Sequence, residues 1–82
     1  MIDGRVQGVF FRDSLRRLAE QHGVAGWAHN TAEGTVEAVF EGEPDAVARL
    51  LSFAELGPPQ AHVDRVEVFE EEPEGLSGFS VR

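Results

Sequence analysis

The chain has 82 residues, with seven arginines, no lysine and no cysteine against fifteen acidic residues, so its formal net charge is −8. This length predicts one domain over residues 1–82, and a hydrophobic content of 41% supports a small core and argues against disorder. The composition excludes disulfides, thiolate metal sites and Schiff-base lysine chemistry, and the negative charge disfavours nucleic acid as a partner.

The first quarter of the chain predicts a strand, a glycine-rich turn and a helix. Residues 2–7 are the strand, and residues 12–22 are the helix because apolar residues recur there at spacings of three and four. Asp13 or Ser14 is expected to accept hydrogen bonds from the amides of the first turn, and Gly23 to end the helix. One face of the helix is expected to hold Phe11, Leu15, Leu18, Ala19 and His22.

A β-hairpin follows. Residues 24–30 and 35–41 are its strands, and Gly34 can adopt the positive φ that the turn between them needs. The second strand alternates between apolar and mostly polar residues. Its inward face is expected to hold Val36, Ala38 and Phe40.

The last part of the chain predicts a helix and two strands. Pro44 suits the first turn of a helix over 44–55, whose buried stripe is Val47, Leu50, Leu51 and Ala54. A strand over 62–70 is expected to have a bulge or a late start, because its apolar residues are an odd number of positions apart. Residues 70–75 form an acidic turn in solvent, and Phe79 and Val81 suit a short closing strand.

The order of elements indicates the fold class. It is β-α-β-β-α-β plus a short end strand, which predicts a ferredoxin-like α+β sandwich: an antiparallel sheet with two helices on one face. The fold by itself does not identify a function.

The turn between the first strand and the first helix has the features of an anion site. Gly4 and Gly8 permit backbone conformations that place successive N–H groups around one anion at a helix start, and Arg12 adds a guanidinium that matches phosphate oxygens. Residues 1–17 hold four arginines and two aspartates, a net of +2, whereas residues 18–82 hold three arginines and thirteen acids, a net of −10. The bland alternative is a tight turn followed by surface arginines.

Three segments in order resemble the acylphosphatase family. The first carries the pattern Gly-x-Val-Gln-Gly-Val-x-Phe-Arg, here Gly4-Arg5-Val6-Gln7-Gly8-Val9-Phe10-Phe11-Arg12. The second is similar to Gly-Trp-Val-x-Asn-x-x-Asp-Gly-x-Val-Glu, here Gly26-Trp27-Ala28-His29-Asn30-Thr31-Ala32-Glu33-Gly34-Thr35-Val36-Glu37. A third, partial match is Gly57-Pro58-Pro59-Gln60-Ala61-His62-Val63.

The resemblance implies an activity and a site. The activity is hydrolysis of the carboxyl–phosphate bond of acyl phosphates, in the same ferredoxin-like fold. Arg12 matches the family's phosphate-binding arginine, and Asn30 matches the asparagine that positions water. Taken alone, Asn30 is also a common residue at the start of a turn. The phosphate-binding turn is expected to comprise Gln7, Gly8, Val9, Phe10, Phe11 and Arg12.

The chain departs from the family pattern in three places. Three residues precede the first motif, which predicts a short first strand, and Ala28 and Glu33 stand where valine and aspartate are usual. The phenylalanine before Arg12 is expected inside the protein, and Phe10 at the border of the site.

No cofactor or metal is expected, since the three histidines (His22, His29 and His62) are not spaced as a ligand set. The expected partner is a small acyl phosphate, with inorganic phosphate as product, for a cytoplasmic monomer without a nucleic-acid or membrane partner. Two other functions stay open: a module of the same fold that binds an anion without turnover, and an RNA-binding domain, which the charge disfavours. A copper-carrier function fails because it needs paired cysteines.

Overall fold

The computed structural model describes residues 1–7, 10–69 and 73–82. Every predicted element is present in these ranges, although the first and fourth strands are shorter than predicted. Residues 70–72 of the predicted acidic turn lie outside the described residues. In chain order the elements are β1 (Ile2–Arg5), α1 (Phe11–His22), β2 (Ala25–Asn30), β3 (Val36–Glu41), α2 (Pro44–Leu56), β4 (His62–Val66) and β5 (Phe79–Val81).

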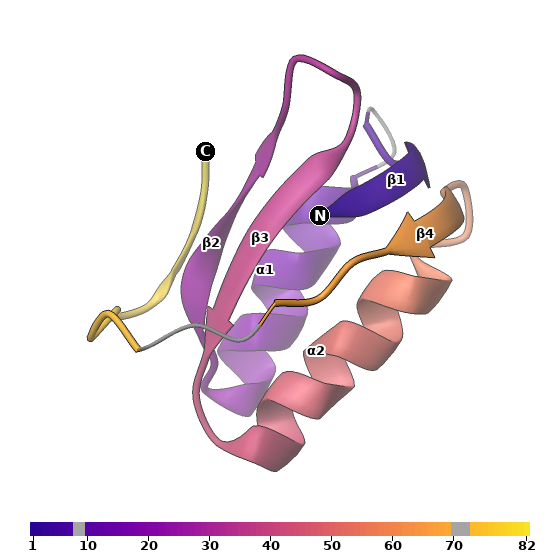
Figure 1. The fold of residues 1–82 in the computed structure, drawn as a ribbon. Coiled ribbons are helices and arrows are strands. Elements are labelled where there is room, and N and C mark those ends of the chain that lie inside the picture. The colour runs from indigo at the N-terminus through magenta and orange to yellow at the C-terminus, as the bar shows by residue number, and fades with distance from the viewer. Residues whose placement is uncertain (8–9, 70–72) are drawn as a thin grey trace.

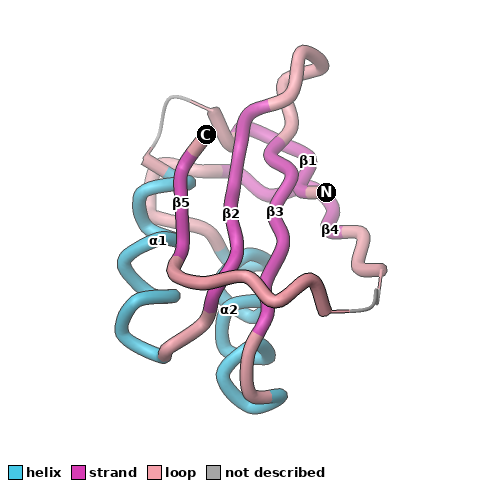
Figure 2. Tube along the Cα trace, turned by 90° about the vertical axis from the view of Figure 1, so that its left-hand side faces the viewer, coloured by secondary structure: helices cyan, strands magenta, loops and turns pink. Residues whose placement is uncertain are grey.

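The strands form one sheet in the order β4-β1-β3-β2-β5, and both helices lie on the same face of it (Figure 1). The pairs among β1 to β4 are antiparallel, as a ferredoxin-like fold requires. The prediction of an antiparallel sheet is incomplete, because β5 runs parallel to β2 at the outer edge (Figure 2). β4 runs opposite to β2, so it ends on the side of the sheet where β2 begins. β5, at the other edge of the sheet, starts from that same side and therefore runs in the direction of β2.

The core lies between the sheet and the helices. The predicted inward face of β3 is confirmed, with Val36 fully buried. One detail of the helices was predicted wrongly. On α2, Phe53 packs against the core in place of Leu51, because its ring meets that of Phe11 at 6.2 Å between centroids. On α1, His22 is exposed in the last turn. The buried apolar residues are Ile2, Val6, Phe11, Leu15, Ala19, Val24, Ala28, Val36, Leu50, Ala54 and Phe79.

The predicted irregularity in the fourth strand is a β-bulge. Asp3 pairs with Arg65 and Gly4 with Val63, so Asp64 has no partner position on β1. Gly4 has a φ of 127°, and a Cβ atom on it would lie 2.1 Å from the carbonyl oxygen of His62. Only glycine fits here, and its position directs the end of β1 into the glycine-rich turn.

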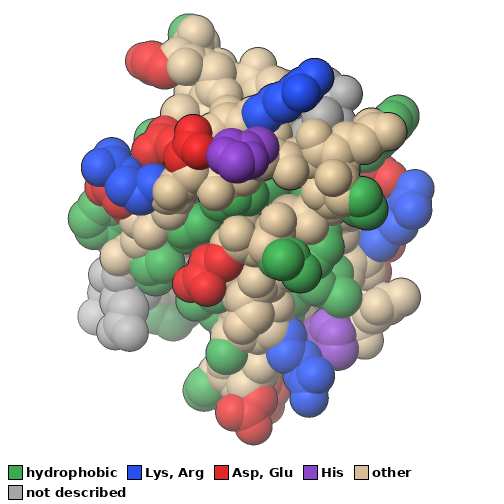
Figure 3. Space-filling model, turned by 90° about the vertical axis from the view of Figure 1, so that its right-hand side faces the viewer, with side chains coloured by type: hydrophobic (Ala, Val, Ile, Leu, Met, Phe, Trp, Pro, Cys, Tyr) green, Lys and Arg blue, Asp and Glu red, His purple; other side chains and the backbone are tan. Residues whose placement is uncertain are grey.

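The edge strand β4 carries charged side chains. Arg65 forms ion pairs with Asp3, at 3.3 Å, and with Glu67, and His62 lies 3.0 Å from Asp64. Acidic and basic side chains are interspersed on the side of the molecule that includes this strand (Figure 3). Such an edge resists pairing with another chain.

Glu41, at the end of β3, anchors the segment before β5. Its two carboxylate oxygens accept hydrogen bonds from the backbone N–H groups of Glu74, at 2.5 Å, and Leu76, at 2.6 Å. This contact holds the segment before β5 close to the end of β3, and β5 itself pairs with β2 through backbone hydrogen bonds. Neither helix in the described ranges has the length and apolar character needed to cross a lipid bilayer.

Candidate active site

The predicted site residues meet at one edge of the sheet. β1 leads into the glycine-rich turn, α1 begins directly after it, and the hairpin between β2 and β3 lies at the same edge. Of the described residues, Phe10, Phe11 and Arg12 line one hollow, whereas Gln7 and Asn30 lie at the same edge of the sheet and do not line it. Gly8 and Val9, which were also predicted to bind phosphate, lie outside the described residues.

The start of α1 leaves backbone donors without helical partners. Phe10 precedes the helix in a left-handed conformation (φ 59°, ψ 27°), and its carbonyl accepts the first helical hydrogen bond, from the N–H of Ser14 at 3.0 Å. No side chain among the described residues caps this end, so the prediction of a cap by Asp13 or Ser14 is wrong. Free N–H groups at a helix start favour an anion.

Asp13 does not cap the helix because its carboxylate binds two arginines of the next turn. Arg16 lies 2.7 Å and Arg17 2.6 Å from its oxygens. The hydrogen bond from Arg16, together with the charge of Arg17, holds the pKa of Asp13 below its ordinary value, although partial desolvation acts in the opposite direction. The same contact raises the pKa of Arg16. Two of the arginines near the turn are therefore engaged with an acid.

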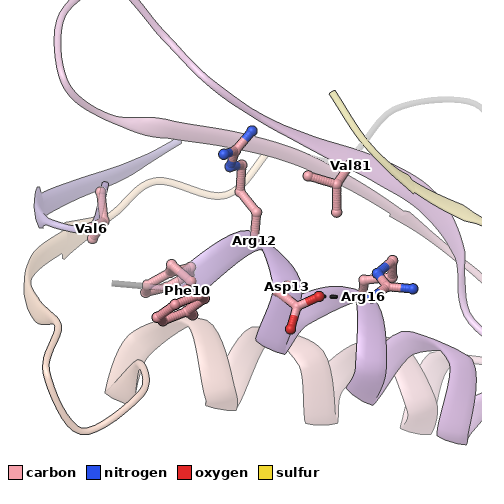
Figure 4. Close-up of a pocket in the computed structure, with 7 residues that line it drawn as sticks. Val6, Phe10, Arg12, Asp13, Arg16 and Val81 are labelled. Carbon is pink, nitrogen blue, oxygen red and sulfur yellow. Dashed lines mark hydrogen bonds and ion pairs between the residues drawn. The ribbon is translucent and has the colours of Figure 1, made fainter. Parts of the chain in front are cut away.

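Arg12 lies in a shallow hollow of about 520 Å³ in front of the helix start. Its guanidinium projects away from α1, with Val81 of β5 beside it (Figure 4). Nη1 donates to the backbone carbonyl of Arg82 at 2.7 Å. A guanidinium has five N–H donors, and none of the other described residues accepts a bond from the rest, which can therefore bind an anion. The sequence patterns did not indicate Arg82, because its contribution is a backbone carbonyl.

Asn30 is the last residue of β2. Its Oδ1 is buried and accepts no hydrogen bond from any described residue, and no other side-chain polar atom in those ranges is left in this state. A buried acceptor without a partner costs about 1–3 kcal/mol, and such atoms in native structures call for an explanation. The neighbouring His29 faces away and bonds Glu37 at 2.8 Å, as strand alternation predicts.

Gln7 ties the turn to the hairpin that begins after Asn30. Its Nε2 donates to the carbonyl oxygens of Thr31 and Thr35, each at 3.0 Å. The two threonine hydroxyls also bond each other at 2.7 Å. The sequence placed Gln7 among the phosphate-binding residues, but the use of its side chain as a link between turn and hairpin was not predicted. A polar residue that closes the base of a turn gives no periodic signal.

The histidines are placed apart. His29 bonds Glu37 on β3, His62 bonds Asp64 on β4, and His22 is exposed on α1. Within residues 1–7, 10–69 and 73–82, no three histidine or acidic side chains come together as a metal site would require.

Comparison with known proteins agrees with this geometry. The acylphosphatase family model matches residues 1–81. The chain is 59% identical over 80 residues to an acylphosphatase of Thermococcus kodakarensis, covering 98% of this chain and 88% of that protein. It is 56% identical over 81 residues to one of Thiobacillus denitrificans, covering 99% and 90%.

The same likeness holds in three dimensions. The structure of an acylphosphatase from Coxiella burnetii superposes with a TM-score of 0.94 at 44% identity, over 99% of this chain and 85% of that one. These findings confirm the family and fold that the three motifs predicted. The chain therefore belongs to the acylphosphatase family, enzymes that hydrolyse the carboxyl–phosphate bond of acyl phosphates to a carboxylate and inorganic phosphate.

Proposed function

We propose that this acylphosphatase holds the phosphoryl group of its substrate with Arg12 and the backbone N–H groups of the turn over residues 7–12, and that Asn30 positions the attacking water. One observation carries the proposal: the buried Oδ1 of Asn30 has no partner among the described residues, on a hairpin that Gln7 links to the turn. Because Oδ1 is shielded from solvent in this conformation, the side chain must turn toward the substrate to bind the water that would supply the missing hydrogen bond.

The reaction needs little from the protein beyond binding and orientation. The water oxygen attacks phosphorus, the bond from phosphorus to the acyl oxygen breaks, and the carboxylate leaves with the electron pair. A carboxylate departs without a proton, so no strong general acid is required. The amide of Asn30 does not ionise, so its role is geometric, and the water's proton passes to a phosphate oxygen.

Arg12 supplies the charge stabilisation. Its N–H groups that are not used by Arg82 can pair with the phosphate oxygens, in the fork geometry that suits a tetrahedral anion. Free amides at the start of α1 add donors and a favourable dipole. We propose on this chemistry that hydrolysis proceeds without a metal ion, in a monomer whose edge strand β4 is protected by its charges.

The roles of Arg12 and Asn30 are separated by measuring turnover and binding together. Benzoyl phosphate hydrolysis is followed in the presence of a chelator, and inorganic phosphate binding by calorimetry. Arg12→Ala should lose both. Asn30→Ala should lose turnover by at least about 100-fold and keep phosphate affinity within about threefold, since it removes only the group that orients water.

His29→Ala is the matched control, because His29 is adjacent in β2 but faces the other way. It should keep the activity of the unmodified enzyme, while circular dichroism confirms that all variants are folded. Full activity in Asn30→Ala would rule out the water-positioning role. Turnover that stops in chelator and returns with added metal would rule out the metal-free mechanism.

A further inference from the structure

Phe10 is an unusual residue for a protein surface. Its side chain is 76% exposed, whereas that of the next residue, Phe11, is 1% exposed. Phe10 is also the one residue other than glycine with a positive φ in the described ranges. An aromatic residue in the left-handed region is strained by about 1–2 kcal/mol, and an exposed ring forgoes the stabilisation of burial. Both costs fall on a residue at the mouth of the active site, which points to a functional use of the ring.

Phe10 lines two hollows. One is the hollow of Arg12. The other, of about 440 Å³, lies between the start of α1 and the turn that follows α2, where Pro58 and Pro59 form its far wall. Figure 4 shows Phe10 and Arg12 projecting from the start of α1 in different directions. A substrate whose phosphate is bound by Arg12 can therefore extend past Phe10 into the second hollow.

The sheet order gives a second argument for this direction. β2, which carries Asn30, and β4, which follows the Pro58–Pro59 turn, are separated by β3 and β1. β1, the strand that precedes the helix start at Phe10 and Arg12, lies between them. In phosphoryl transfer the attacking and leaving oxygens are roughly in line on opposite sides of phosphorus. If water is held on the side of Asn30, the acyl group leaves on the side of Pro58 and Pro59.

The second hollow suits an apolar group better than an acidic one. Phe10, Pro58 and Pro59 are apolar residues that line it. The charged residues that line it, Asp13 and Arg17, pair with each other at 2.6 Å, so the apolar side chains make up much of the rest of the wall between them and the turn after α2.

We propose that the acyl group of the substrate lies in this second hollow, against Phe10, and that Phe10 makes the enzyme select acyl phosphates with a planar, apolar acyl group. The inference rests on the proposed function, since it takes the phosphate from Arg12 and the water from Asn30. It adds a residue that determines specificity and a substrate class, aromatic acyl phosphates.

The test is the ratio of kcat/KM for benzoyl phosphate to that for acetyl phosphate, which share the phosphate end. In Phe10→Ala this ratio should fall about five- to tenfold, the size expected for one aromatic contact. Phe10→Leu, which keeps apolar volume without a flat face, should give an intermediate ratio. Pro59→Ser, on the opposite wall, should lower the ratio about twofold. Alanine and leucine keep a Cβ atom, so the backbone preference at position 10 changes little.

Each outcome decides the inference. An equal loss for both substrates in Phe10→Ala would mean that the residue only shapes the turn, and would overturn it. A ratio that falls in Phe10→Ala but is unchanged in Pro59→Ser would overturn the placement of the acyl group in the second hollow. Failure of the proposed function looks different, since turnover would then survive in Arg12→Ala or Asn30→Ala whatever the ratio.

Discussion

Nη1 of Arg12 lies 2.7 Å from the backbone carbonyl oxygen of Arg82, so the first turn of α1 is tied to the end of the chain across a separation of 70 residues. The carbonyl is in place because β5 pairs with β2, where the N–H of Arg82 donates to the carbonyl of Ala28 at 2.8 Å. One donor of the guanidinium is thereby fixed, and the direction of the rest is constrained before substrate binds.

This relationship predicts that charge alone cannot replace Arg12. Lysine keeps the positive charge but has a compact ammonium group, which cannot hold the carbonyl of Arg82 and two phosphate oxygens in a planar fork. Arg12→Lys should lower kcat/KM about 10²–10³-fold. Steady-state hydrolysis of acetyl phosphate measures this. Arg49→Lys, on the exposed face of α2, is the control and should leave turnover unchanged; near-normal activity in Arg12→Lys would show that the fork geometry is unimportant.

The link made by Gln7 predicts a selective loss of turnover. Gln7→Ala removes two hydrogen bonds to Thr31 and Thr35 and should destabilise the fold by about 1–3 kcal/mol. Because the hairpin that begins after Asn30 is then less well placed, kcat should fall about tenfold, with a smaller effect on phosphate affinity. Gln7→Glu should be more damaging, since a carboxylate would face two carbonyl oxygens. Urea unfolding and steady-state kinetics test both variants. Equal losses of kcat and phosphate affinity would contradict the prediction that the Gln7 side chain acts on turnover by positioning the hairpin.

The bulge in β4 predicts that Gly4 tolerates no side chain. A Cβ atom would meet the His62 carbonyl oxygen at 2.1 Å and the backbone nitrogen of Asp64 at 2.8 Å, so the strands must move apart. Gly4→Ala should cost about 3 kcal/mol or more of unfolding free energy. In Gly34→Ala the residue also has a positive φ, 88°, but its Cβ would meet nothing within 4 Å, so only the conformational cost of about 1 kcal/mol is expected. Chemical denaturation of the two variants compares the cost of the steric clash at Gly4 with the conformational cost at Gly34. Similar losses of unfolding free energy in the two variants would argue against the clash.

The ion pairs of Asp13 predict an acid-sensitive contribution to stability. The hydrogen bond from Arg16 lowers the pKa of Asp13 in the folded protein, so its stabilisation is present above the unfolded pKa of about 3.9 and is lost as the pH falls through the folded value. The unfolding midpoints of the unmodified protein and Asp13→Asn should therefore differ at pH 6. They should converge below about pH 3, where the carboxyl group of Asp13 becomes protonated. The difference should also shrink in about 1 M salt, since the carboxylate is solvent-screened.

Asp45→Asn is the matched control, because Asp45 is in the first turn of α2, as Asp13 is in α1. It tests the effect of an acid at a helix start without the two arginines. A pH dependence of the same size in Asp45→Asn would assign the effect to the helix dipole and not to the ion pairs.

Much of the fold was readable from the sequence because it depends on local pattern. Alternation placed Val36 inside, spacings of three and four placed Phe11 and Leu15 inside, and the odd spacing of Val63 and Val66 predicted the bulge. The three motifs likewise predicted the family. These signals lie between residues close in the chain, where periodicity and turn chemistry act.

Only the tertiary structure decided how the site is held together. The parallel pairing of β5, the carbonyl of Arg82 on Arg12, and the link from Gln7 to the hairpin join segments 24 to 70 residues apart. Their donors and acceptors are mostly backbone groups, which every residue carries and no sequence pattern marks. The sequence by itself determined the family and the candidate site residues, and long-range packing determined which partners hold those residues, because such contacts form only when the sheet and helices have closed around one core.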